Sequence, residues 1–160
     1  PDKGKTIFSP ATKIKEIMDI LAVQLKNHEI GISLTEADGA VDGYDKEFGQ
    51  VILNILNNAR DAFLENKTQS PSIIVTESIQ NNRFVVSIED NAGGISEDIV
   101  GRVFEPYFST KEEGKGTGIG LYMSKTIVET NMGGLLEVAN KDNGAVFTIK
   151  IPLAEGTIGG

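Results

Sequence analysis

The sequence predicts an α/β two-layer sandwich, in which a mixed, mostly antiparallel sheet carries helices on one face. Three observations lead to this fold class. Apolar residues recur at helical spacing in some segments and alternate, or form Ile- and Val-rich runs, in others. Two pairs of expected strands are separated by turns short enough for hairpins, whose strands are antiparallel. Each amphipathic helix also needs an apolar surface to cover, and a sheet provides one.

The first helix is expected to begin at Ser9-Pro10, because serine caps free N–H groups and proline fits the first helical turn. Apolar residues then follow at helical spacing up to Asn27, namely Ile14, Ile17, Met18, Leu21 and Leu25. Between Glu29 and Leu34 the apolar period changes to two, which predicts a strand.

A second, longer helix is expected from Asp45, its expected N-cap, to Phe63. Segments 72–79 and 83–89 are rich in Ile and Val and are separated by three polar residues, which predicts a hairpin. A glycine-rich loop and a short helix at 97–103 are expected to follow.

The last helix is expected from Leu121 to Asn131, and Gly133-Gly134 is its expected C-cap. Strands at 135–139 and 145–152 flank Asn143-Gly144, a dipeptide that strongly favours a hairpin turn. These two strands complete the predicted sheet.

The chain is expected to form one domain, at residues 9–153, because no internal repeat, low-complexity tract or long linker divides it. Residues 1–8 are expected to be a linker, and residues 154–160, which are small and polar, a flexible tail. Since the chain does not begin with Met, we expect it to be a piece of a longer protein.

Composition excludes several classes of function. Lys+Arg 15 against Asp+Glu 23 gives a net charge of −8, which would repel a nucleic-acid backbone, so we expect no nucleic-acid partner. The absence of cysteine excludes disulfides, thiol catalysis and Cys-ligated zinc. No apolar run reaches the ~20 residues that span a bilayer, and the first residues are no signal peptide, so we expect no membrane insertion of this domain.

Three polar residues, Asn54, Asn58 and Asp61, are spaced to lie along one face of the second helix. Asparagine is a poor helix former, so this run lowers helix propensity without an evident structural gain. A solvated helix face is one interpretation. The other is a Mg²⁺ site, because amide oxygens suit this hard cation, which protein usually shares with substrate phosphates.

The segment Asp90-Asn91-Ala92-Gly93-Gly94-Ile95 directly follows an expected strand. An ordinary turn is one interpretation. The other is a site for a flat heterocycle, because a single carboxylate at a strand end can accept from an exocyclic amine where glycines allow close approach.

The glycine-rich segment 114–121 ends at the start of a helix, where free N–H groups and the helix dipole attract phosphate. It is neither a P-loop nor a dinucleotide fingerprint, and a loop that only caps the helix is the alternative. The aromatic cluster at 104–108 adjoins residues 109–117, which have almost no apolar anchor and are expected to form a mobile lid. His28, the sole histidine, is expected to have a surface or structural role.

Together and in this order, these segments resemble the ATP-binding catalytic domain of bacterial sensor histidine kinases. That domain belongs to the ATPase superfamily of gyrase B subunits, ninety-kilodalton heat-shock chaperones and MutL proteins, and the resemblance implies its Bergerat-type ATP-binding fold. It covers the chain from about Ser9 to Leu153. Residues 50–59 resemble the N box, 90–95 the G1 box, 104–111 the F box, 114–121 the G2 box and 144–148 a last, weaker glycine motif.

The resemblance implies a site for ATP and Mg²⁺. Asn58 would ligate Mg²⁺, Asn54 would support the phosphate side, and Asp90 would bind the adenine amino group. The residues implied in nucleotide binding are Asn54, Asn58, Asp90, Gly94, Ile95, Lys111, Lys115, Gly116, Thr117, Gly118, Gly120, Leu121 and Thr148.

Two residues depart from the family pattern. Ala92 stands where many members have glycine, and its small side chain still permits close approach. Asp61 stands where many members have a basic residue near the phosphates, so neutralisation here is expected to depend on Mg²⁺, Lys111 and Lys115.

The resemblance also implies the activity and the partners. A histidine kinase of a two-component system transfers the γ-phosphate of ATP to a histidine on a separate dimerisation domain, to which residues 1–8 would be the linker, and then to an aspartate of a response-regulator receiver domain. No phosphoacceptor motif is present in this chain, so we expect no autophosphorylation by the fragment alone. The parent protein is expected to be a homodimer, and this domain to be cytoplasmic. Two alternatives within the superfamily stay open: an anti-sigma-factor type serine kinase and a nucleotide-gated binding module.

Overall fold

A mixed, mostly antiparallel sheet forms one layer of the molecule, as predicted. The structure is a computed structural model that describes residues 4–108 and 119–155. Within these residues the main sheet has five strands in the order β2-β4-β5-β7-β6. The strands are β2 (Gly31–Thr35), β4 (Ser72–Gln80), β5 (Arg83–Asp90), β6 (Leu135–Lys141) and β7 (Gly144–Pro152). Only the β2–β4 pair among them is parallel.

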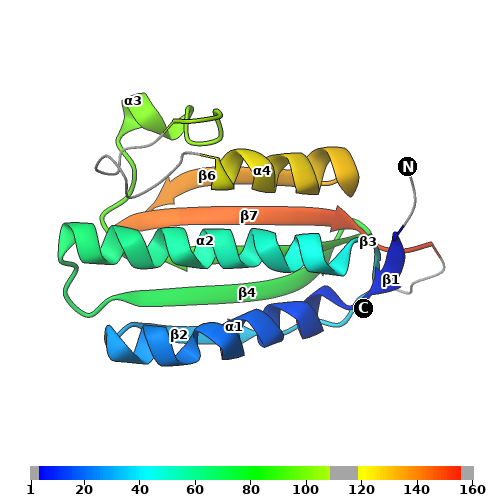
Figure 1. The fold of residues 1–160 in the computed structure, drawn as a ribbon, viewed down its shortest axis with the longest axis horizontal. Helices are drawn as coiled ribbons and strands as arrows, with labels where there is room; N and C mark the ends of the chain where they lie inside the picture. Colours follow the sequence, from blue (N-terminus) through cyan, green and yellow to red (C-terminus); the bar gives the residue numbers. More distant parts are fainter. Residues whose placement is uncertain (1–3, 109–118, 156–160) are drawn as a thin grey trace.

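The helices lie on one face of this sheet (Figure 1). They are α1 (Pro10–Asn27), α2 (Asp45–Asn66) and α4 (Gly120–Thr126), which continues as the π-helix η1 (Ile127–Asn131). A one-turn helix, α3 (Glu97–Val100), lies outside the β6 edge of the sheet in Figure 1 and is shorter than the 97–103 expected. The α/β two-layer sandwich is therefore confirmed.

The core lies between the helices and the covered face of the sheet. Alternate residues of β5 and β7 supply the sheet side, and all of them are almost completely buried: Phe84, Val86, Ile88, Phe147, Ile149 and Ile151. Alternation of this kind assigns each strand residue to the helix face or to the open face. One stripe of α2 supplies the other side, with Phe48, Val51, Ile52, Ile55 and Leu56.

A second, small sheet contains part of the segment that was expected to be a linker. Residues 6–8, expected within a linker, form β1 (Thr6–Phe8), which pairs antiparallel with β3 (Val41–Gly43). Val41 also bridges to Leu153, and the N–H of Ala154 donates to the carbonyl of Ala40 at 2.8 Å. The first residue of the expected tail is thus anchored, and residues 156–160 lie outside the described part.

Two local predictions are wrong. Tyr44, and not Asp45, is the N-cap residue of α2, and Asp45 is instead an acidic residue of its first turn. The β6–β7 turn consists of Asp142 and Asn143, because Lys141 pairs with Gly144. Gly144 is needed as the first strand residue, since an added Cβ would lie 1.6 Å from the carbonyl oxygen of Asp90.

Among the described residues, no helix combines the length and the apolar character that crossing a membrane requires.

Candidate functional site

Asn54 joins α2 to the start of α4. Its Oδ1 accepts from Gln50 Nε2 at 2.9 Å, and its Nδ2 donates to the Gly120 carbonyl at 3.2 Å and to Ser124 Oγ at 3.1 Å. Ser124 is fully buried, so this contact is part of the packing between the two helices. Asn54 therefore fixes the first turn of the helix that follows the glycine-rich segment.

Asn58 lies one helical turn further along α2 and is half-buried. Its side chain forms no hydrogen bond with any residue that the structure describes. The neighbouring Asn57 has a buried Oδ1 atom without a hydrogen-bond partner among the same residues. The Asn58 amide thus remains available as an acceptor or a ligand, whereas the Asn57 oxygen is enclosed by the fold.

Arg60 is a cation on α2 that the sequence analysis did not consider. Its guanidinium lies 3.2 Å from Asp61 Oδ1 and donates to Gln24 Oε1 at 2.5 Å. Asp61 is therefore paired with a basic neighbour, which offsets its negative charge beside the Asn54–Asn58 face.

Asp90 is a half-buried carboxylate at the end of β5, on the face that the helices cover. Its Oδ1 accepts from the Ala92 N–H at 3.0 Å and from the Ala145 N–H at 3.3 Å. Burial raises the pKa of Asp90, and these two hydrogen bonds oppose the increase. Within residues 4–108 and 119–155, Asp90 has no ion pair and its Oδ2 accepts no hydrogen bond, which leaves one acceptor for a ligand.

The loop after Asp90 is attached on several sides. The Asn66 side chain of α2 donates to the Ala92 carbonyl at 2.7 Å, which brings the end of α2 beside this loop. Gly93 and Gly94 both have positive φ, at 101° and 84°, as glycine allows. Ala92 is 5% exposed and its methyl group packs into the core.

The predicted aromatic cluster lies between this loop and α4. Phe104 meets Phe147 edge-on at 6.1 Å between ring centroids, and Lys125 of α4 lies 4.7 Å from the Phe104 centroid. Lys125 also pairs with Glu129 at 3.1 Å. Phe104 is thus fixed against both layers of the fold.

The other predicted residues fall into three groups. Gly120 and Leu121 begin α4, and Leu121 packs against the core. Thr148 lies opposite Ser87 on the open face of the sheet, so the structure does not bring it together with Asp90. Lys111, Lys115, Gly116, Thr117 and Gly118 lie outside the described residues, as does the expected lid at 109–117.

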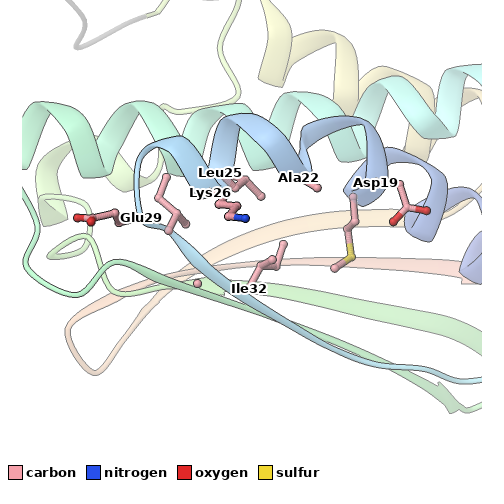
Figure 2. Close-up of a pocket in the computed structure, with 9 residues that line it drawn as sticks. Asp19, Ala22, Leu25, Lys26, Glu29 and Ile32 are labelled. Atoms are coloured by element: carbon pink, nitrogen blue, oxygen red, sulfur yellow. The ribbon is translucent and has the colours of Figure 1, made fainter.

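A pocket of about 460 Å³ lies elsewhere, between α1 and β2, where Leu25 and Ile32 meet Lys26 and Glu29 (Figure 2). It contains none of the predicted site residues. His28 is exposed at the C-cap of α1, next to this pocket, which agrees with the surface role expected for it.

Comparison with known proteins agrees with this arrangement. A family model described as histidine kinase-, DNA gyrase B- and HSP90-like ATPase matches residues 43–155. The two-component sensor PprA of Pseudomonas aeruginosa is 37% identical over 152 residues, which cover 92% of this chain and 16% of that relative. The chain therefore spans only a small part of the length of such relatives.

Solved structures show the same fold. The nucleotide-free catalytic domain of the histidine kinase ThkA superposes with a TM-score of 0.79 at 27% identity, covering 92% of this chain and 95% of that one. ThkA in complex with the response regulator protein TrrA gives a TM-score of 0.76 at 24% identity, covering 92% of this chain and 41% of that one. The family model matches most of the length of this chain, and the chain has the fold of a histidine kinase catalytic domain. The chain therefore belongs to the histidine kinase-, DNA gyrase B- and HSP90-like ATPases.

Proposed function

We propose that this chain binds Mg·ATP and donates the γ-phosphoryl group to a histidine on a separate dimerisation domain, for relay to a response-regulator aspartate. Membership of an ATPase family supports nucleotide binding. The observation that carries the proposal is Asp90, a half-buried carboxylate with one oxygen held by backbone N–H groups and the other open.

Asp90 is suited to reading an adenine base. An exocyclic amine donates hydrogen bonds, and a carboxylate with one oxygen held by two backbone N–H groups offers it the other oxygen as an acceptor. A Cβ on Gly93 would meet no described atom within 4 Å, so the loop is open at this residue and glycine leaves room for a flat ring beside the backbone. We assign the base to this loop, with Gly94 and Ile95 as its neighbours.

The phosphates would extend from the base toward Asn58 and the start of α4. Within the described ranges, no group of three acidic or histidine side chains could hold a metal ion by itself. The amide of Asn58 fits a Mg²⁺ ion that takes its other ligands from water and phosphate oxygens, and that ion would neutralise the phosphate charge. Lys111, Lys115 and residues 116–118 are proposed to contact the triphosphate, with Gly120 and Leu121 at the adjoining helix start.

The role of this chain in the transfer is to position the nucleotide. The bond between the γ-phosphorus and the oxygen that bridges to the β-phosphate breaks, and its electron pair leaves on ADP. A phosphorus–nitrogen bond forms with the acceptor imidazole, whose proton passes to water. His28 is the sole histidine of this chain and is the C-cap residue of α1, shortly before β2. In the sheet, β4 lies between β2 and β5, the strand that carries Asp90. The acceptor must therefore come from another domain.

The partners follow from the same proposal. The relative PprA is named a two-component sensor, and ThkA has been solved with a response regulator. We propose a histidine-bearing dimerisation domain and a receiver domain as the partners of this chain, in a homodimeric parent protein whose ATPase domain lies in the cytoplasm.

Labelling with [γ-³²P]ATP tests the proposal. The chain alone should stay unlabelled, whereas adding the parent's dimerisation domain in trans should give that domain an acid-labile, base-stable phosphohistidine. A phosphoserine on a protein partner would instead favour the anti-sigma-factor type kinase. Nucleotide binding without any transfer to the dimerisation domain would favour a nucleotide-gated binding module.

A further inference from the structure

Asn140, near the end of β6, holds the Asp90–Ile95 loop by both ends of its amide. The Ile95 N–H donates to Asn140 Oδ1 at 2.7 Å, and Asn140 Nδ2 donates to the Ile95 carbonyl at 2.6 Å. Because Ile95 offers one donor and one acceptor, only one orientation of the amide satisfies both bonds. The two hydrogen bonds thus resemble those that a residue of a neighbouring β-strand would form with the Ile95 backbone.

The same β6–β7 hairpin contacts this loop at two further points. The Gly93 N–H donates to the Asn143 carbonyl at 2.8 Å, and the Ala145 N–H donates to Asp90 Oδ1 at 3.3 Å. Both of these bonds use hairpin backbone groups, so they do not depend on which side chains the hairpin carries. Asn140 is the side chain that extends the attachment past the glycines.

The loop needs such an attachment, because its two glycines leave the backbone free to adopt many conformations. Gly94 has a φ of 84°, and a Cβ placed on it would lie 3.1 Å from Asn140 Oδ1. Without the two bonds to Ile95, the described residues between Gly94 and Phe108 would have no hydrogen bond to the hairpin. If a ligand needs this segment in one conformation, the entropy lost in ordering the segment would then weaken binding.

We infer that Asn140 is a positioning residue for nucleotide binding, which it promotes by holding the Asp90–Ile95 loop in the conformation that receives the base. Asn140 acts through the loop and does not itself bind the base. The inference rests on the proposed function, since it concerns the same nucleotide site.

Calorimetric titration with MgADP and with MgATP tests the inference on the whole chain. Asn140→Ala should weaken the binding of both ligands by the same factor, about 3- to 10-fold. The net free energy of a hydrogen bond is small, and the base is common to both ligands. Asn143→Ala is the matched control, since it removes the same side chain from the same hairpin and keeps the backbone bond to Gly93. The control should bind both ligands as the parent does.

A double-mutant cycle separates positioning from a general structural role. If Asn140 acts through the loop, Asn140→Ala should cost little further affinity once Asp90→Asn has removed the contact with the base. Hydrogen exchange of the Ile95 amide should be faster in empty Asn140→Ala than in Asn143→Ala. Should Asn140→Ala not fold, Asn140→Ser, which keeps a hydroxyl at this position, takes its place.

The outcomes distinguish this inference from the proposed function. If the parent chain binds neither MgADP nor MgATP, the proposed function fails. If the parent chain binds them and Asn140→Ala binds as tightly as Asn143→Ala, the inference is overturned while nucleotide binding stands. A loss from Asn140→Ala that is equal in the parent chain and in the Asp90→Asn variant would likewise overturn it.

Discussion

Replacing Asp90 by Asn should weaken nucleotide binding while leaving the loop intact. Asparagine has nearly the same shape, and its Oδ1 can still accept from the N–H groups of Ala92 and Ala145. The open oxygen becomes an NH₂ group, so a donor would face the donor on the base. An unsatisfied pair of this kind costs about 1–3 kcal/mol, which corresponds to about 5- to 150-fold weaker binding.

The same substitution should stabilise the empty protein at neutral pH. Burial raises the folded-state pKa of Asp90 above its ordinary value of 3.8, so the folded state binds more protons than the unfolded state as the carboxyl titrates. The ionised carboxylate therefore lowers stability at pH values above the raised pKa. The neutral amide avoids this cost, and its advantage should disappear as the pH falls through the raised pKa toward 3.8.

Two measurements check this reasoning. Calorimetry should give a weaker MgADP affinity for Asp90→Asn, with a ratio to the parent that shrinks as the pH falls and Asp90 takes up a proton. Thermal melts of the empty proteins should give a higher Tm for the variant at pH 7 to 8. Unchanged MgADP affinity would show that Asp90 does not read the base, and a large drop in Tm would assign it to the fold.

Three further substitutions test other parts of the structure. Asn58→Ala should weaken Mg·ATP far more than metal-free ATP in calorimetry with and without EDTA, and equal losses would contradict a metal ligand at this position. Glu77 is a buried residue of β4, and its pKa is raised by burial and by Glu36 and Asp38. Glu77→Gln should therefore raise the Tm at pH 7 to 8 and lose this gain in acid, and a gain that grows in acid would contradict this sign. Gly144→Ala should cost about 1–3 kcal/mol of stability in urea unfolding, since the added methyl group meets the Asp90 carbonyl, and an unchanged midpoint would refute the close approach.

The order and type of the main elements could be predicted because they depend on local periodicity. The stripe of α2 and the alternation in β5 and β7 are visible in the sequence, and so are the two hairpins. Strand β1 could not be predicted, because three residues carry no clear period and owe their conformation to pairing with β3. The shifted β6–β7 turn likewise depends on a distant contact with Asp90.

The positions of some candidate site residues could also be predicted from the sequence. Asp90 follows a strand whose alternation places it on the helix face, so its position could be derived. The same alternation places Thr148 on the open face, between the buried Phe147 and Ile149, and that signal was present in the sequence. The role of Asn140 was not predictable, because its partner Ile95 is 45 residues away and no local pattern records the contact.

The β1–β3 pair brings both ends of the described chain together. Both ends of the described chain attach to β3, and Pro152 pairs with Arg83, seven residues along β5 from Asp90. At a rise of about 3.3 Å per residue, Asp90 lies roughly 23 Å from that attachment. A segment joined to either terminus would therefore hold the domain near this end, whereas the proposed nucleotide site lies toward the opposite end of β5. A rotation of about 20° about this end would move Asp90 through an arc of roughly 8 Å, so a small rotation could change the position of the proposed nucleotide site without altering its structure.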